Sequence, residues 1–397
     1  MPKAASLTES YDVVVIGGAL VGGSAAYHLL TREPGLRVAV VEPDPTYEFA
    51  ASSLSFGGVR VLFSQEENIQ MSQYGHEFYG DFARLTAVDG EAAALDFHRQ
   101  GYLFIATEAD AARDLEANFA LQRRLGCAVE MLDGAGLAAR YPSLRTSDVL
   151  AAVLAAQDGW IDPNGALVGL RRKAHALGAR YRAARVVDLA HDGSRIQGVV
   201  LDDGDRLEAE WVVNCAGAWA GGISAMVGME IPVVPLSRTN FHFDCRERLE
   251  PMPLLRDIPG SGFRPEGASY ICGYTDFARV GRFDFEPRYE VFENHLWPGL
   301  AHRVPAFEAV RVQSAWAGHY AYNQFDGNLV IGPWIGGLEN FLVATGFSGH
   351  GLQHAPAVGR ALAELILDGA FQSIDLKRFT YQRIVDETPY PERGMRA

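Results

Sequence analysis

The fold is decided by residues 11–42, which begin Tyr11-Asp-Val-Val-Val-Ile-Gly-Gly-Ala-Leu-Val-Gly-Gly-Ser24 and close on Arg37-Val-Ala-Val-Val-Glu42. This pattern predicts a strand, a glycine-rich turn, a helix and a second strand that ends on a carboxylate. The turn lets the backbone approach a pyrophosphate, and the helix N-terminus offers it unpaired N–H groups. Glu42 follows Gly22 by 20 residues, where an acidic side chain can bind a ribose hydroxyl pair. The segment therefore predicts an adenine-dinucleotide site.

The turn departs from the G-x-G-x-x-G spacing at one position. Gly17 and Gly22 take the first and last places, Ala19 takes the middle one, and Gly18 lies beside it. A methyl group in the middle place crowds a phosphate, so a strand–helix packing turn of some other α/β protein is the alternative interpretation. Glu42 and the two flanking strands favour dinucleotide binding.

The composition of the 397-residue chain is that of a globular protein, with 48% hydrophobic and 21% charged residues. Its length favours two domains. A net charge of −14 argues against a nucleic-acid partner. No apolar run is long enough to predict a membrane span, and the N-terminus shows no apolar signal core. The four cysteines have no C-x-x-C spacing, so we expect reduced thiols, no metal site and a cytoplasmic protein.

Three strand–loop units with glycines are spread along the chain, at residues 16–23, 214–222 and 345–351. A dinucleotide with a long second half needs such distributed contacts, whereas a nicotinamide cofactor does without the last of them. The pattern therefore favours FAD, with a nicotinamide enzyme as an alternative. A further local pattern, Ser64-Gln-Glu-Glu67, predicts a capping box that opens a helix reaching about Leu85.

A family resemblance rests on four motifs in order: the opening βαβ unit, Asn214-Cys-Ala-Gly-Ala-Trp219, Asp326-Gly-Asn-Leu-Val-Ile-Gly332 and Gly346-Phe-Ser-Gly-His-Gly351. Together they resemble the D-amino-acid oxidase superfamily of flavoproteins, in its sarcosine oxidase and glycine oxidase branch. The stretch from Ser52 to Arg60 is also similar to a subgroup related to a mitochondrial FAD-dependent oxidoreductase involved in respiratory complex I assembly.

This resemblance implies an α/β fold (α+β overall), with a Rossmann-like FAD-binding domain and an interleaved antiparallel-sheet substrate domain. The FAD-binding domain would comprise residues 1–85, 150–230 and 311–397, and the substrate domain residues 86–149 and 231–310. The resemblance also implies the residues that contact FAD, which are Gly17, Gly18, Ala19, Gly22, Glu42, Ser52, Ser53, Val186, Ala216, Gly217, Trp219, Gly346, Gly349, His350, Gly351 and Leu352. Relatives with thioether-linked flavin carry cysteine where this chain has Gly318, so we expect non-covalent FAD.

The reaction implied by the resemblance is oxidation of a C–N bond in a small secondary or N-substituted amino acid that is sarcosine-, glycine- or iminodiacetate-like. Hydride passes to flavin N5, and the imine then hydrolyses in water. A guanidinium suits the substrate carboxylate because it pairs with both oxygens. We expect Arg60, Arg238 and Arg264 to bind substrate, Arg60 and Arg264 also acting in catalysis. Each could instead be a solvated charge at a strand end.

His319 and Tyr320 are the other expected catalytic residues, since the segment that holds them crosses the flavin in the family. A packed, hydrogen-bonded core histidine is the alternative for His319. Tyr274 is an expected member of the substrate pocket wall. For His350 we favour a structural hydrogen bond over catalysis.

The electron acceptor is left open as O2 or another molecule. Oxygen-using relatives carry lysines near the flavin where this chain has Ile271 and Gln353, which argues against fast reaction with O2. A non-catalytic or dehydrogenase-type flavoprotein with an assembly or electron-transfer role is therefore the alternative to an amino-acid oxidoreductase.

Overall fold

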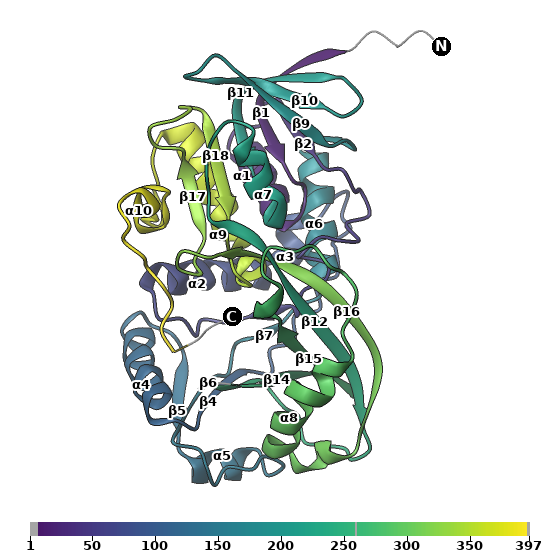
Figure 1. The fold of residues 1–397 in the computed structure, drawn as a ribbon, viewed down its shortest axis with the longest axis vertical. Coiled ribbons are helices and arrows are strands. Elements are labelled where there is room, and N and C mark those ends of the chain that lie inside the picture. The colour runs from purple at the N-terminus through teal and green to yellow at the C-terminus, as the bar shows by residue number, and fades with distance from the viewer. Residues whose placement is uncertain (1–6, 259, 395–397) are drawn as a thin grey trace.

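The computed structural model describes residues 7–258 and 260–394, and it confirms the mixed α/β fold. The outermost ends of the expected domain segments, residues 1–6 and 395–397, lie outside the described residues, as does residue 259. Two eight-stranded sheets form the two halves of the molecule (Figure 1). None of the helices in the described part of the chain combines the length and apolar character needed to cross a bilayer.

The first sheet has the order β17-β18-β11-β1-β2-β8, and β10 and β9 extend from β11. Its strands are β1 (Thr8–Ile16), β2 (Val38–Val41), β8 (Arg180–Arg182), β9 (Val186–His191), β10 (Ile196–Leu201), β11 (Arg206–Asn214), β17 (Val330–Pro333) and β18 (Phe341–Thr345). Strand β1 pairs in parallel with both β2 and β11. Its run Val13–Ile16 is buried, as a parallel strand covered on both faces requires.

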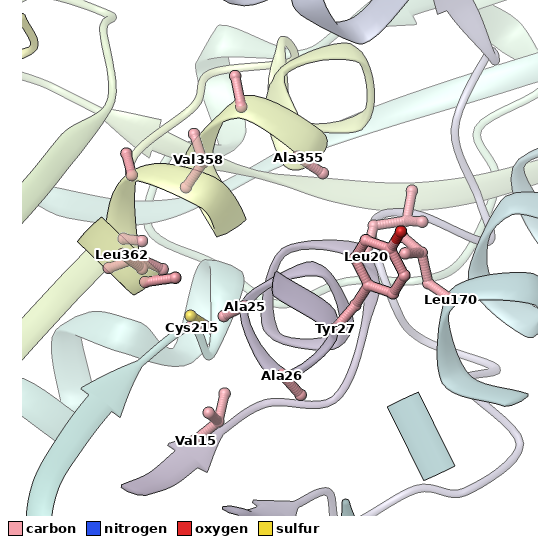
Figure 2. Packing of buried hydrophobic residues seen from close by; sticks show 14 of the residues in the cluster. Val15, Leu20, Ala25, Ala26, Tyr27, Leu170, Cys215, Ala355, Val358 and Leu362 are labelled. Atoms are coloured by element: carbon pink, nitrogen blue, oxygen red, sulfur yellow. The ribbon is translucent and has the colours of Figure 1, made fainter. Parts of the chain in front are cut away.

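Helix α1 (Leu20–Arg32) lies between this sheet and helices α9 (Gly351–Asp368) and α6 (Pro163–Ala176), as Figure 2 shows. Small residues allow α1 and α9 to approach closely. A Cβ at Gly359 would lie 2.2 Å from the Ser24 hydroxyl oxygen. The packing holds the N-terminal ends of α1 and α9 at fixed positions beside the carboxyl ends of the strands.

The second sheet has the order β16-β12-β15-β14-β13-β4-β6-β5. Its strands are β4 (Tyr102–Ala106), β5 (Val129–Leu132), β6 (Ala151–Ala155), β12 (Val233–Cys245), β13 (Leu254–Ile258), β14 (Gly262–Glu266), β15 (Ser269–Thr275) and β16 (Val310–Asn323). Strands β6 and β16 come from segments expected in the FAD-binding domain, yet they pair with β4, β5 and β12. The division into two domains stays a prediction. By their pairing, β6 and β16 group with strands that were expected in the substrate domain.

The remaining α-helices and β-strands connect and cover the sheets. They are α2 (Glu66–Gly80), α3 (Phe82–Thr86), α4 (Ala109–Arg124), α5 (Gly134–Arg140), α7 (Ala220–Ala225), α8 (Trp297–Arg303), α10 (Gln382–Val385) and the short pair β3 (Gly58–Val59) and β7 (Gly159–Trp160). Helix α2 runs between the two halves of the molecule (Figure 1).

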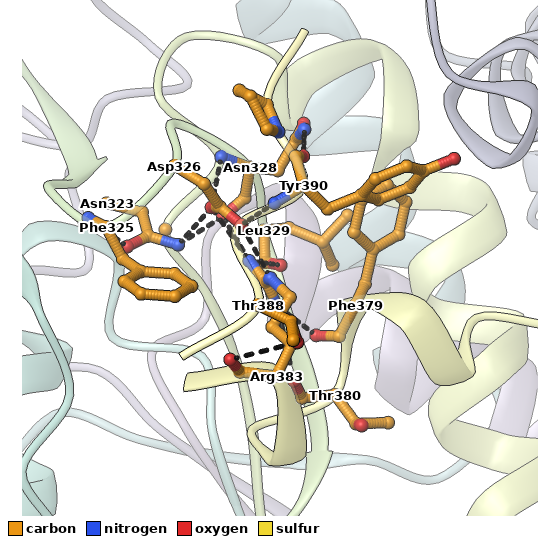
Figure 3. Close-up of polar contacts among 12 residues, drawn as sticks. Asn323, Phe325, Asp326, Asn328, Leu329, Phe379, Thr380, Arg383, Thr388 and Tyr390 are labelled. Carbon is orange, nitrogen blue, oxygen red and sulfur yellow. Dashed lines mark hydrogen bonds and ion pairs between the residues drawn. The ribbon is translucent and has the colours of Figure 1, made fainter. Parts of the chain in front are cut away.

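The C-terminal segment is tied to the rest of the chain by buried polar contacts (Figure 3). Arg383 and Asp326 form an ion pair at 2.7 Å, with side chains 4% and 0% exposed. The Tyr390 N–H also donates to Asp326, at 3.0 Å. Further on, the Glu392 carboxylate accepts from the Ser64 N–H and hydroxyl, both at 2.6 Å.

These contacts correct the expected capping box. Ser64 binds Glu392, while α2 begins two residues later after Gln65, which makes no side-chain cap. The helix also ends at Gly80, and a separate short helix, α3, follows. A partner from the far end of the chain thus replaces the local hydrogen bond that the pattern predicts.

Candidate functional site

A cavity of about 490 Å³ opens at the carboxyl ends of β1, β2 and β11. We call it the Gly17 cavity. Of the residues expected to contact FAD, those that line it are Gly17, Ala19, Glu42, Ser52, Val186, Ala216, Gly217, Trp219, Gly349, Gly351 and Leu352. The carboxyl edge of a parallel sheet is where open α/β folds bind ligands.

The glycine turn at the floor of this cavity has no room for larger residues. Gly17 has a φ of +95°, and a Cβ there would lie 2.6 Å from the Cys215 carbonyl oxygen. A Cβ at Gly22 would lie 1.9 Å from the Gly17 carbonyl oxygen, so the first turn of α1 lies directly against the loop. Helix α1 has no side-chain cap and no acidic residue in its first turn. Its N-terminal N–H groups are thus available to a pyrophosphate.

Glu42 lines the same cavity and is held by backbone N–H groups. Its carboxylate accepts from Gly18 at 2.9 Å and from Asp44 at 3.0 Å. Burial raises the pKa of Glu42 above its ordinary value, despite these two hydrogen bonds. The Tyr47 hydroxyl next to it is buried without a hydrogen-bond partner in the described chain. These groups fit the ribose end of a dinucleotide, with Val186 further along the wall.

The other end of the Gly17 cavity is formed by the loop that precedes β3. The Leu54 carbonyl accepts from Asn240 at 3.2 Å and from the Trp316 ring N–H at 3.1 Å, which ties this loop to β12 and β16. A Cβ at Gly318 would lie 2.9 Å from that of Leu54. Gly318 therefore gives the loop room against the sheet. The Ser53 hydroxyl is buried here and has no partner among the described residues.

The third glycine loop meets the second at this end. The Thr345 hydroxyl donates to the Gly217 carbonyl at 2.9 Å. Helix α9 follows with no side-chain cap and no acidic residue in its first turn, and Gly351 and Leu352 line the cavity. A positive helix end at this place favours negative charge on a bound ring. The three glycine units and the uncapped N-termini of α1 and α9 therefore fit FAD.

A second cavity, of about 800 Å³, adjoins the first. The two share Ser55, Tyr320, Gly349 and Leu352 as lining residues. We call the second one the arginine cavity because Arg60, Arg238, Arg256 and Arg393 are among its lining residues. It occupies the space between the second sheet and the start of α9, where a substrate would contact the end of the Gly17 cavity.

Two of the expected arginines are in this cavity. Arg238, on β12, donates to the Asn240 side-chain oxygen at 3.1 Å, and its guanidinium lies 5.7 Å from the Tyr320 ring centre. Arg60 follows β3. Its N–H donates to the Gln353 side chain at 2.8 Å, and its guanidinium lies 4.1 Å over the Phe63 ring. Both guanidiniums are therefore oriented by fixed neighbours.

The structure does not bring Arg264 to either cavity. Arg264 donates to the Phe56 carbonyl at 2.8 Å and pairs with Glu266. Its role is to hold the Phe56 segment, which lines the arginine cavity. Tyr274 lies on the opposite face of β15 from Gly273 and stacks on His295, with ring centres 4.9 Å apart. These placements argue against the expected substrate contacts of both residues.

His319 also lies away from the cavities. Successive residues of a strand point to opposite faces, so His319 faces away from Tyr320. Its Nε2 accepts from the Asp284 N–H at 2.9 Å, and the rings of Phe283 and Phe285 pack against it. Burial lowers its pKa to about 4. The geometry fits the alternative of a packed core histidine and argues against the expected catalytic role.

The histidine that lines the arginine cavity is His350. Burial, followed by the nearby charge of Arg60, holds its pKa well below the ordinary value, so the ring is neutral at physiological pH. Its ring packs edge-on against Phe63, with centres 5.0 Å apart. Of the other expected FAD contacts, Gly18 and Gly22 shape the turn, and Gly346 precedes the loop with a φ of +76°.

Arg256 is the functional candidate that the sequence interpretation missed. It lies in β13, in Leu254-Leu-Arg-Asp-Ile258, and register pairs it with Gly262. The signal that could have found it is the interruption of an apolar strand by a charged residue. No group of three or more His, Cys, Asp or Glu side chains in the described residues is arranged to hold a metal.

Comparison with known proteins is consistent with this geometry. The family model described as DAO, FAD dependent oxidoreductase, matches residues 12–365. The chain is 37% identical over 429 residues to FAD-dependent oxidoreductase domain-containing protein 1 of Xenopus laevis, covering 98% of this chain and 85% of that protein. It is 26% identical to mouse mitochondrial sarcosine dehydrogenase, over 96% of this chain but 42% of that protein. The structure of L-proline dehydrogenase from P. horikoshii superposes with a TM-score of 0.86 at 26% identity, covering 97% and 100% of the two chains.

Proposed function

From the premise that this chain belongs to the DAO family of FAD dependent oxidoreductases, we propose that it oxidises the C–N bond of a small secondary or N-substituted amino acid. The family and the FAD dependence are those expected from the sequence. The similarity to sarcosine dehydrogenase and L-proline dehydrogenase, whose names specify secondary amino acids, supports the substrate class.

FAD, when bound, supplies the hydride acceptor for the carbon next to the amine nitrogen. Gly17, Ala19 and the start of α1 would hold its pyrophosphate, and Glu42 its ribose. Ser52, Gly351 and Leu352 lie at the far end of the same cavity, toward the arginine cavity. We expect FAD to dissociate, because Gly318 faces Leu54 and offers no thiol.

The single observation that carries the proposal is the junction of the two cavities at Tyr320 and Gly349. A cation-lined cavity there opens onto the end of the cofactor site. In this arrangement Arg238 binds the substrate carboxylate, and its contact with Asn240 fixes the direction of the guanidinium. His350, neutral and beside the junction, can accept a hydrogen bond from the amine.

The test is anaerobic reduction of the bound flavin by sarcosine, dimethylglycine, iminodiacetate, glycine, proline and D-amino acids, followed by absorbance. We expect at least one N-substituted amino acid to bleach the flavin. Arg238→Gln should weaken the binding of that substrate by about 10- to 100-fold, because it removes a charge-assisted hydrogen-bonded pair. Arg238→Lys should recover part of the loss, since it restores the charge but not the planar fork.

Failure of every amine to bleach the flavin would refute the proposal and favour the alternative, a flavoprotein with an assembly or electron-transfer role. Equal reduction by the Arg238→Gln variant would leave the oxidation in place but remove Arg238 as the anchor. Arg311→Gln is the matched control, since it removes an exposed guanidinium from the same sheet.

A further inference from the structure

The second sheet provides space for two guanidinium-bearing side chains through two glycines. A Cβ at Gly273 would lie 2.6 Å from a terminal nitrogen of Arg238. A Cβ at Gly262 would lie 2.7 Å from the Cδ of Arg256. Arg238 thus leans across β15, and Arg256 leans across β14, both on the face of the sheet that lines the arginine cavity. Any larger residue at these positions would displace the arginines.

The charges of these two arginines are not balanced by the protein around them. Within residues 7–258 and 260–394, no carboxylate forms an ion pair with Arg256 or Arg238. Arg238 has the side-chain oxygens of Asn240 and Thr275 as acceptors, which are neutral. Burial, and then the neighbouring Arg238 charge, lower the pKa of Arg256. Arg238 is buried and Arg256 partly buried, so their unbalanced charge is costly and an anionic ligand would be stabilised here.

The acidic residues of the same cavity have other partners or lie at its other end. Asp257 binds Arg303 at 2.7 Å, and Glu392 accepts from Ser64. Asp114, on α4, lies beside the C-terminal segment, since a Cβ at Gly394 would be 2.9 Å from the Asp114 Cβ. Toward α4 the cavity thus has residues of both charge signs, with Glu108, Asp110 and Asp114 beside Arg393. Toward Tyr320 its charged residues are the cations Arg60, Arg238 and Arg256, which favours anionic groups at the inner end.

The spacing of the strands indicates that the two arginines come from opposite sides. β12 and β13 are three steps apart in the order β12-β15-β14-β13. At about 4.8 Å per step, their backbones are about 14 Å apart. The two side chains reach toward each other from these strands, over Gly273 and Gly262 on the adjacent strands β15 and β14, so their guanidiniums can bind two neighbouring carboxylates of one ligand. A cavity of about 800 Å³ also exceeds what a three-carbon amino acid fills.

We propose that Arg256 is a specificity-determining residue that binds a second carboxylate of the substrate, next to the one bound by Arg238. The substrate is then an N-substituted amino acid with an anionic group on each side of the amine. This inference rests on the proposed function for the oxidation step, but the two-carboxylate binding site can be measured without any turnover.

The experiment compares two unreactive thioethers, thiodiacetate with two carboxylates and (methylthio)acetate with one. Binding to the FAD-loaded protein is measured by calorimetry and by perturbation of the flavin spectrum. We expect wild type to prefer thiodiacetate by at least about tenfold, the size of one charged hydrogen-bonded contact. Arg256→Gln should remove this preference and leave (methylthio)acetate within a factor of about three. Arg256→Lys should keep part of it.

Equal affinity of the two thioethers for wild type would overturn the inference, and this comparison needs no variant. An unchanged preference in Arg256→Gln would also overturn it. Gly273→Ala, which displaces the Arg238 guanidinium, should weaken the binding of both thioethers, whereas Arg311→Gln should weaken the binding of neither. If thiodiacetate binds through Arg256 while no amine bleaches the flavin, the proposed oxidation fails and the two-carboxylate site stands. If sarcosine and iminodiacetate reduce the flavin equally well in wild type and in Arg256→Gln, the proposed oxidation stands and the two-carboxylate site fails.

Discussion

Adding one methyl group to Gly22 should disable the cofactor site, whereas adding one to its neighbour Gly23 should not. In Gly22→Ala the new Cβ would lie 1.9 Å from the Gly17 carbonyl oxygen, a distance that side chains do not adopt. In Gly23→Ala the nearest atom is 3.7 Å away, which is an ordinary contact. Both residues lie in the first turns of α1, so the pair separates the clash from the effect of alanine itself.

The magnitude follows from the geometry. To relieve the contact, the start of α1 has to move from the Gly17 loop by about 1 Å or more, and such overpacking costs about 1–3 kcal/mol. Because the same movement takes the helix N–H groups away from a pyrophosphate, we expect FAD binding to weaken by about 10- to 100-fold. Gly23→Ala should keep FAD binding and raise the free energy of unfolding by about 0.5–1 kcal/mol through helix propensity.

The assay is titration of the apoprotein with FAD, followed by flavin fluorescence, together with thermal unfolding of apo and loaded forms. A Gly22→Ala variant that binds FAD as tightly as wild type would refute the described turn. Equal damage from Gly23→Ala would show that any side chain in this part of α1 is harmful, and the specific contact with Gly17 would lose its support.

Three further outcomes are expected. Arg383→Met leaves the buried Asp326 carboxylate without its ion pair and should lower the free energy of unfolding in urea by about 3–5 kcal/mol, whereas Arg378→Met, which removes a 64%-exposed side chain, should change it by less than about 1 kcal/mol. Burial lowers the pKa of His28 and His319 to about 4, so the unfolded state binds more protons than the folded state below about pH 6.5. The free energy of unfolding should therefore fall by about 2 kcal/mol per histidine between pH 7 and 5. His319→Gln should make this pH dependence shallower, and an unchanged pH dependence would contradict the lowered pKa of His319. Acid precipitation should release the flavin into the supernatant, and colour that stays in the pellet would reject non-covalent FAD.

The first sheet and the glycine turns could be predicted from the sequence because their signals are local. The apolar run before Gly17 and the positive φ at that glycine are properties of a few adjacent residues. The capping box at Ser64 failed for the opposite reason, since the hydroxyl binds Glu392, which is 328 residues away in sequence. Propensity and pattern carry no information about such a partner.

The candidate site could be predicted only in part. His319 and Tyr320 were both expected to act in catalysis, although neighbouring residues of a strand cannot face the same side. That constraint alone would have removed one of them. It was harder to foresee that Arg256, and not Arg264, lines the arginine cavity. This placement depends on the register that sets Arg256 opposite Gly262. Register in a sheet of eight strands is decided by pairing between distant segments.

The sheet under the arginine cavity also limits how its selectivity can change. Among related proteins an arginine on this face can lie on a neighbouring strand, which shifts it by about 4.8 Å per strand. Along one strand it can shift only by two residues, about 6.8 Å, because the residue between points to the other face. The separation of two carboxylates that the cavity accepts would therefore differ among related proteins in coarse increments. Finer adjustment would require a shorter or longer cationic side chain at the same position. A series of diacids of increasing length should accordingly show a sharp optimum and not a gradual trend.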